Sequence, residues 1–152
     1  MFPSGHPATR EGLVYDESRW DGKTCLEYTP DGKMLDIRED KKKVGAFLNP
    51  VRKDVRKFAL SIVREIVRNY DVDAYALDYC RYPGDDSDFS ADSRKAFEHY
   101  LGKKVRNFPD DIFTWNADGT KNPGIYYKEW WAFRANVITS FVKEVRKEIK
   151  YS

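Results

Sequence analysis

The chain has 152 residues and a net charge of +2, because 27 Lys and Arg nearly balance 25 Asp and Glu. Hydrophobic residues make up 41% of it, too many for a wholly disordered chain, and no apolar run approaches the ~20 residues of a membrane-spanning helix. This composition predicts one folded domain and gives no sign of a nucleic-acid or membrane partner.

Residues 1–43 are predicted to be a loop-rich N-terminal part. Two Asp-Gly pairs in it are typical of turns, and the apolar islands around the second pair predict short strands near 26–29 and 34–37. The chain does not open with a basic stretch followed by an apolar one, so no signal peptide is expected within it. Whether Cys25 pairs with Cys80 is left open.

Residues 44–82 carry the pattern of a βαβ unit. Short, mostly apolar runs predict buried strands at 44–48 and 72–79. A helix is expected over 51–70, because its apolar residues recur at steps of three and four. Strand, helix and strand at this spacing predict two neighbouring parallel strands.

Residues 83–125 are predicted to be a long loop insert with one short helix. That helix is expected near 91–101, with Ser90 as its N-cap and Gly102 as its stop. A second long helix is predicted over 126–150 from its apolar stripe.

The insert holds an acidic run formed by Asp85, Asp86, Asp88 and Asp92. The run lacks the glycine and glutamate spacing of an EF-hand, so loop and helix-cap roles are expected rather than a Ca²⁺ site. His6 and His99 have no partner at metal-ligand spacing, and no nucleotide-binding motif is present, so neither a metal nor another cofactor is expected.

Polar side chains stand where the two predicted strands end. Asn49 follows the first strand, and Asp78, Tyr79, Arg81 and Tyr82 end or follow the second. Parallel neighbours lie ~4.8 Å apart, so both strand ends are expected to face one ligand. An arginine favours the ionised form of a carboxylate beside it, and an ionised Asp78 suits a nucleophile or a stabiliser of an oxocarbenium-like centre. A purely structural pairing of Asp78 with Arg81, which would tie down the loop, is an equal alternative.

These motifs resemble the bacterial glycosyl-hydrolase-like family 10. Its barrels show Asn-Pro after one strand and a Tyr-Asp-Val-Asp-Gly-x-x-x-Asp-x-x-Arg-Tyr pattern on the next. Asn49-Pro50 and residues 70–82 match these motifs here, except that Ala74 replaces the glycine. Further likeness, within a resemblance that spans most of residues 44–149, lies in Asp88-Phe89-Ser90, Phe97-Glu98 and residues 130–134.

The resemblance implies an α/β fold, namely a segment of a (β/α)8 TIM-type barrel with parallel strands and a long βα loop insert. It implies a glycoside hydrolase acting on a poly- or oligosaccharide. Asp78 would be the catalytic carboxylate, and Asn49, Tyr79, Arg81 and Tyr82 would bind substrate. The chain holds about two of the eight βα units of such a barrel. The second carboxylate is therefore expected elsewhere, and the chain alone is expected to be inactive.

Two further consequences concern partners and place. Open strand edges predict self-association. The resembled family is often exported, and the location of this chain is left open.

Two other functions are weighed against the hydrolase. A non-catalytic carbohydrate-binding module would expose several coplanar rings drawn from Tyr79, Tyr82, Trp115, Trp130 and Trp131, whereas a barrel would bury Trp130. Nucleic-acid binding through the basic face of the 51–70 helix is disfavoured by the near-neutral charge.

Overall fold

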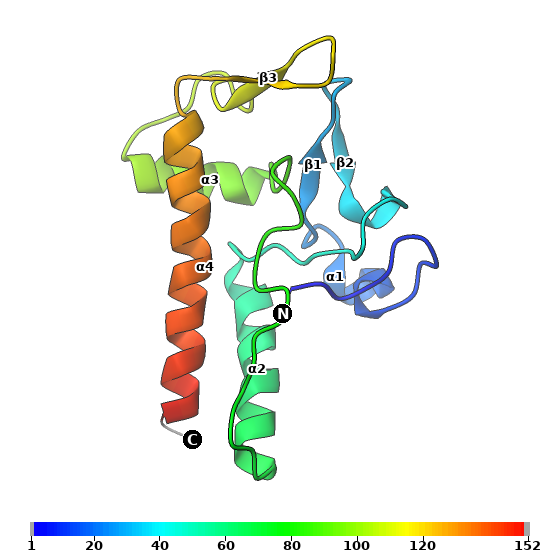
Figure 1. Cartoon of the computed structure of the whole chain (residues 1–152), viewed down its shortest axis with the longest axis vertical. Helices are drawn as coiled ribbons and strands as arrows, with labels where there is room; N and C mark the ends of the chain where they lie inside the picture. Colours follow the sequence, from blue (N-terminus) through cyan, green and yellow to red (C-terminus); the bar gives the residue numbers. More distant parts are fainter. Residues whose placement is uncertain (1, 151–152) are drawn as a thin grey trace.

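In the computed structural model, which describes residues 2–150, two long helices lie side by side and run in the same direction (Figure 1). They are α2 (Lys53–Asn69) and α4 (Tyr127–Lys150), and the shorter α3 (Ala91–Leu101) crosses the upper half of α4. The three helices confirm the predictions made from apolar periodicity. No helix among the described residues is both long and apolar enough to cross a membrane.

The strands form two separate antiparallel pairs. β1 (Leu26–Tyr28) pairs with β2 (Met34–Asp36), and this confirms the predicted hairpin. β3 (Phe113–Trp115) pairs with β4 (Lys121–Pro123) in a region that was expected to be loop. Strand β4 consists of Lys121, Asn122 and Pro123, which lack the apolar and β-branched residues by which a strand is recognised in a sequence. Helical turns complete the N-terminal part: η1 (Leu13–Tyr15), α1 (Glu17–Trp20) and η2 (Ile37–Glu39).

Helix α3 begins and ends where its sequence predicts. The Ser90 hydroxyl accepts a hydrogen bond from the Ser93 N–H at 3.2 Å and so caps the first turn. Gly102 adopts the left-handed conformation, with φ of 70°, and closes the last turn.

Arginines on α2 hold it against α4. Arg56 pairs with Glu144 at 2.6 Å, and Arg64 pairs with Glu148 at 2.7 Å. A second Arg56 nitrogen donates to the carbonyl oxygen of Val137 at 2.6 Å. Part of the basic face that was weighed as a nucleic-acid surface therefore joins the two helices.

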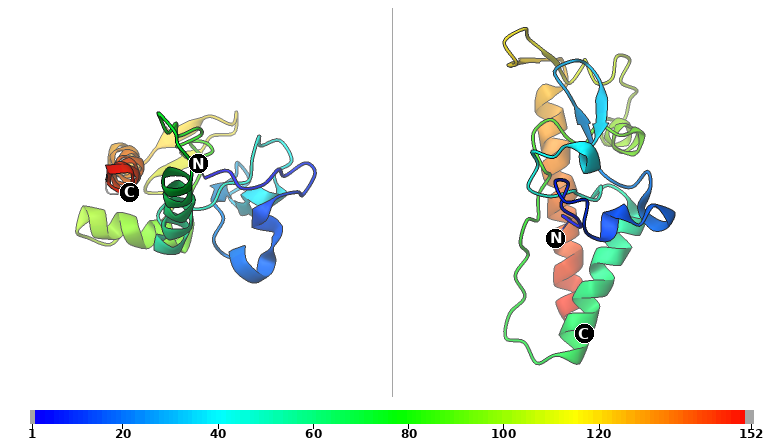
Figure 2. Two further views of the ribbon diagram at one scale, coloured as in Figure 1. Left: turned by 90° about the horizontal axis from the view of Figure 1, so that it is seen from below. Right: turned by 90° about the vertical axis from the view of Figure 1, so that its right-hand side faces the viewer.

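The predicted parallel strand pair is not formed in residues 2–150. Phe47 and Leu48 make only single antiparallel bridges, to Pro3 and Thr24. The second predicted strand, 72–79, is an irregular extended segment that leaves the far end of α2 and runs back along the molecule (Figures 1 and 2). Parallel strands are found almost only where helices cover both faces of the sheet. Here the N-terminal segment already forms backbone hydrogen bonds with residues 46–48, so these residues are not paired with the 72–79 segment.

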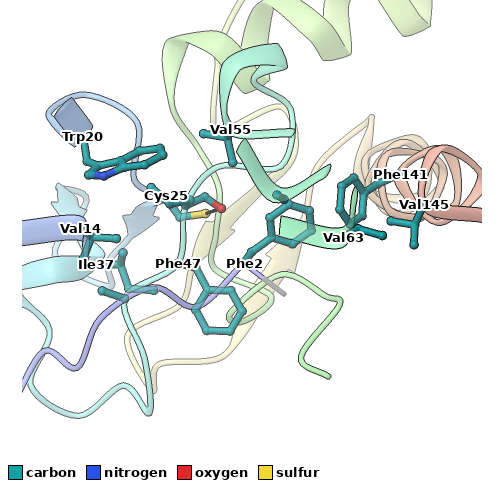
Figure 3. Close-up of a cluster of buried hydrophobic side chains, with 13 residues drawn as sticks. Phe2, Val14, Trp20, Cys25, Ile37, Phe47, Val55, Val63, Phe141 and Val145 are labelled. Atoms are coloured by element: carbon teal, nitrogen blue, oxygen red, sulfur yellow. Dashed lines mark hydrogen bonds between the residues drawn. The ribbon is translucent and has the colours of Figure 1, made fainter. Parts of the chain in front are cut away.

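Two hydrophobic cores lie along α4. The first gathers the N-terminal segment, α2 and the second half of α4, and in it the rings of Phe2 and Phe141 meet at 4.8 Å (Figure 3). The second gathers the rings of the insert against the first half of α4 around Trp130. Cys25 is buried in the first core, Cys80 is half-buried, and both thiols are free, so the open question of a disulfide is answered in the negative.

Candidate functional site

A buried carboxylate, Asp88, lies at the point where three elements begin or pass. Its side chain accepts hydrogen bonds from the Leu26 N–H at 2.5 Å, the Asn49 amide at 2.6 Å and the Ser93 hydroxyl at 2.6 Å. The Ser90 hydroxyl also donates to it at 2.5 Å. Burial raises the pKa of Asp88, and the hydrogen bonds from Leu26, Ser90 and Ser93 oppose that rise.

This Asp88 network (Asp88, Asn49, Ser90 and Ser93) ties separate parts of the fold together. Asn49 donates to Asp88 and also accepts from the Val51 N–H at 3.0 Å, just before α2 begins. The network therefore links β1, the approach to α2 and the N-terminus of α3. Asn49 is 1% exposed, so the structure places its side chain inside the fold and away from solvent.

The other three acids of the acidic run are held by cations. Asp85 pairs with Lys121 at 2.6 Å and Asp92 with Arg52 at 2.5 Å. Asp86 pairs with Lys43, which also bonds the buried Glu27 at 2.7 Å. These are the loop and cap roles that the sequence predicts. Within residues 2–150 no three His, Cys, Asp or Glu side chains are grouped as a metal site would need.

Asp78, Tyr79 and Arg81 lie together on the exposed end of the irregular segment. The Asp78 carboxylate accepts from the Tyr79 N–H at 2.8 Å. The Arg81 guanidinium carbon lies 5.1 Å from the centre of the Tyr79 ring, and its Nη1 donates to the carbonyl oxygen of Tyr82 at 3.0 Å. Tyr79 has a φ of 48°, a left-handed conformation that costs roughly 1 kcal/mol or more outside glycine.

Tyr82 points into the interior, where its ring covers Arg134 of α4. The Arg134 guanidinium carbon lies 4.4 Å from the centre of the Tyr82 ring and 4.6 Å from that of Trp131. Arg134 donates to the carbonyl oxygen of Gly84. Its Nε and Nη1, and the Tyr82 hydroxyl, find no hydrogen-bond partner among the described residues.

The burial of this pair changes its acid–base properties. It lowers the pKa of the Arg134 guanidinium and raises that of the Tyr82 hydroxyl well above its ordinary value.

A groove of about 570 Å³ runs between residues 80–84 and α4. Arg81 and Tyr82 line one side, and Trp131, Arg134 and Thr139 line the other. Two of the five predicted site residues thus reach the groove, whereas Asn49 is buried in the Asp88 network and Asp78 and Tyr79 do not line it. Arg134 was not singled out from the sequence as a site residue. Its place in the 130–134 motif could have identified it. An arginine within a helix is usually exposed to solvent, so the helix pattern alone gave no reason to single it out.

Comparison with known proteins identifies a family and a relative for this chain. The family model described as glycosyl hydrolase-like 10 matches residues 35–152. An S-layer-related protein from Niallia circulans is 36% identical over 151 residues, which cover 97% of this chain and 9% of that protein. The chain therefore spans less than a tenth of the length of this relative. No solved structure matches.

Proposed function

The chain belongs to the glycosyl hydrolase-like 10 family, and from this membership we propose that it is a segment of a (β/α)8-barrel glycoside hydrolase. The observation that carries the proposal is the family match, which covers both strand-end motifs, the insert and the long helix. The proposed substrate is a poly- or oligosaccharide, bound beside the exposed carboxylate of Asp78.

The directions of the elements support a barrel segment. In a β/α barrel each helix runs antiparallel to its strand, so successive helices run parallel to each other. Helices α2 and α4 have this relation, and the irregular segment 71–81 runs back in the opposite direction (Figure 1). We propose that this segment becomes a strand when other barrel strands flank it.

The exposed residues of that segment are proposed to act on the sugar. Asp78 supplies one carboxylate, Tyr79 and Arg81 contact the substrate, and Asn49 and Tyr82 position this end of the segment from within the fold. Glycosidases need two carboxyl groups, ~5–5.5 Å apart for retention and ~6.5–9.5 Å apart for inversion. The second group is proposed to come from outside this chain, which then binds oligosaccharides without cleaving them.

The positions of the rings do not favour a separate binding module. Trp130 is 1% exposed, Tyr82 is buried, and Trp115 donates its indole N–H to the carbonyl oxygen of Tyr28. Tyr79 and Trp131 are the exposed rings of the five, one on the segment 71–81 and the other on α4, so the five do not form one exposed platform. Burial of Trp130 is the outcome expected of a barrel helix.

The test compares Asp78→Asn with Asp73→Asn, because both carboxylates are exposed on the same segment. Calorimetric titration with a panel of oligosaccharides is expected to show about tenfold weaker binding for Asp78→Asn, a loss of about 1.4 kcal/mol, and no change for Asp73→Asn. Equal behaviour of the two variants would contradict the role of Asp78. Efficient hydrolysis by the purified chain, abolished in Asp78→Asn, would show instead that the second carboxylate lies within it.

A further inference from the structure

The groove between residues 80–84 and α4 has a one-sided charge. Two arginines, Arg81 and Arg134, line it, and none of its lining residues is an acid. Of the acids near it along the chain, Asp85 and Asp86 are engaged by Lys121 and Lys43, whereas Asp78 and Glu129 are exposed and do not line the groove. The groove is therefore an electropositive site with aromatic walls.

Arg134 is more deeply buried than its known contacts explain. Its side chain is 4% exposed, and one bond to the Gly84 carbonyl leaves Nε and Nη1 without partners among residues 2–150. An ionised group taken out of water is costly unless an opposite charge or hydrogen bonds compensate it. The rings of Tyr82 and Trp131 supply only part of that compensation. A bound anion in the groove would supply the rest.

The walls of the groove suit a sugar ring. Trp131 is 37% exposed beside Arg134, and Thr139 adds a hydroxyl about two turns after Trp131 on α4. Aromatic faces bind flat apolar surfaces, and a few polar groups then fix the orientation of the ligand. The volume of about 570 Å³ lies within the range typical of small-ligand sites.

We propose that this groove is a subsite for an acidic sugar, a hexuronic acid unit whose carboxylate is held by Arg81 in the field of Arg134 and whose ring packs on Trp131. The inference rests on the proposed carbohydrate function and names the class of sugar. A guanidinium presents paired N–H donors that match the two oxygens of a carboxylate. A neutral sugar would bring no carboxylate to Arg81, and Arg134 would be left with the partial compensation that Asp85 and Asp86 give it.

The test uses the whole 152-residue chain and two matched ligands. They are an oligogalacturonide of three units and the same oligosaccharide after chemical reduction of its carboxyl groups. Calorimetric titration at low salt is expected to show at least tenfold tighter binding of the acidic form, with the preference declining as salt is added. Arg81→Gln is expected to abolish this preference, whereas Arg106→Gln, at another exposed arginine, is expected to preserve it.

A second variant tests the ring contact. Trp131→Ala is expected to weaken the binding of both oligosaccharides about tenfold. In the wild-type chain, the indole N–H resonance of Trp131 is expected to shift when either oligosaccharide is added. Equal affinity for the acidic and reduced forms would overturn the acidic-sugar inference and leave the carbohydrate function intact. Failure of both oligosaccharides to bind would overturn the subsite. The proposed function would then depend on the Asp78→Asn comparison with other oligosaccharides.

Discussion

The Asp88 network and the segment 71–81 both carry residues that resemble family motifs, yet the fold treats them in opposite ways. Asp88 is fully buried and all its hydrogen-bonding partners come from this chain. The segment 71–81 is mostly exposed, although its sequence is apolar enough for a buried strand. The comparison indicates that the Asp88 motif is completed by contacts within the described residues, whereas the segment 71–81 is left uncovered, as the proposed barrel would require of a strand without its neighbours.

The largest expected effect on stability comes from removing the buried carboxylate of Asp88. Asp88→Ala leaves the donors of Leu26, Ser90 and Ser93 without their acceptor, while the Asn49 amide keeps its bond to the Ser90 hydroxyl at 3.0 Å. A buried unsatisfied donor costs about 1–3 kcal/mol, so we expect a loss of at least about 3 kcal/mol in the free energy of unfolding. Urea denaturation followed by circular dichroism measures it. A loss below about 1 kcal/mol would show that the network is not needed for folding.

Adjacent tryptophans on α4 give the next largest contrast. Trp130 stacks on Phe89 with a centroid distance of 5.0 Å, and its edge meets Phe97 at 4.9 Å. Trp130→Ala is expected to cost about 3–5 kcal/mol, because it opens a cavity in the second core. Trp131→Ala removes a half-exposed ring and its contact with Arg134, at a cost of about 1 kcal/mol. Thermal unfolding of both variants tests this, and equal costs would place Trp131 in the core.

A buried glutamate, Glu27, is expected to make stability depend on pH. Glu27 is buried on β1, and desolvation raises its pKa to about 7 although Lys43 opposes the shift. The unfolded chain therefore releases the Glu27 proton at lower pH than the folded chain. Stability is expected to fall as pH rises from about 4.5 to about 7, by about 3 kcal/mol.

The control for this expectation is Glu27→Gln, which keeps an acceptor for Lys43 but does not titrate. Its stability is expected to be flatter over the same pH range than that of the wild-type chain. Denaturation midpoints measured at half-unit pH steps provide the comparison. An unchanged slope would assign the pH dependence to other groups, such as Asp88, whose pKa burial also raises.

The same contrast explains what could be predicted from the sequence. The helices at 53–69, 91–101 and 127–150 follow from local periodicity and from the caps at Ser90 and Gly102. The parallel strands were predicted incorrectly for this structure, because strand pairing depends on distant partners that an apolar run does not specify.

The candidate site was predictable only in part, for a related reason. Motif positions identified Asp78, Arg81 and Tyr82, two of which reach the groove. They could not reveal that Asn49 would be used by Asp88, since that contact joins residues 39 positions apart. Arg134 lies further still from Tyr82 in sequence, so its burial under that ring was also invisible to local pattern.

The smallest expected effect tests whether the segment 71–81 is as loosely held as the structure indicates. Val63 of α2 is fully buried, whereas Val72 is 44% exposed. Valine and threonine have nearly the same shape, so Val→Thr at each site measures burial without opening a cavity. Val63→Thr is expected to cost about 1–3 kcal/mol, because it buries a hydroxyl. Val72→Thr is expected to cost less than about 0.5 kcal/mol.

Concentration extends this last test to the proposed self-association. A second copy that covers the exposed edge would bury Val72, and the cost of Val72→Thr would then grow with protein concentration. Denaturation at two concentrations a hundredfold apart, with light scattering alongside, distinguishes the cases. A small cost that is independent of concentration, in a monomer, would mean that the segment is left uncovered in solution. A second copy of this chain would then be excluded as the source of the strands proposed to flank the segment.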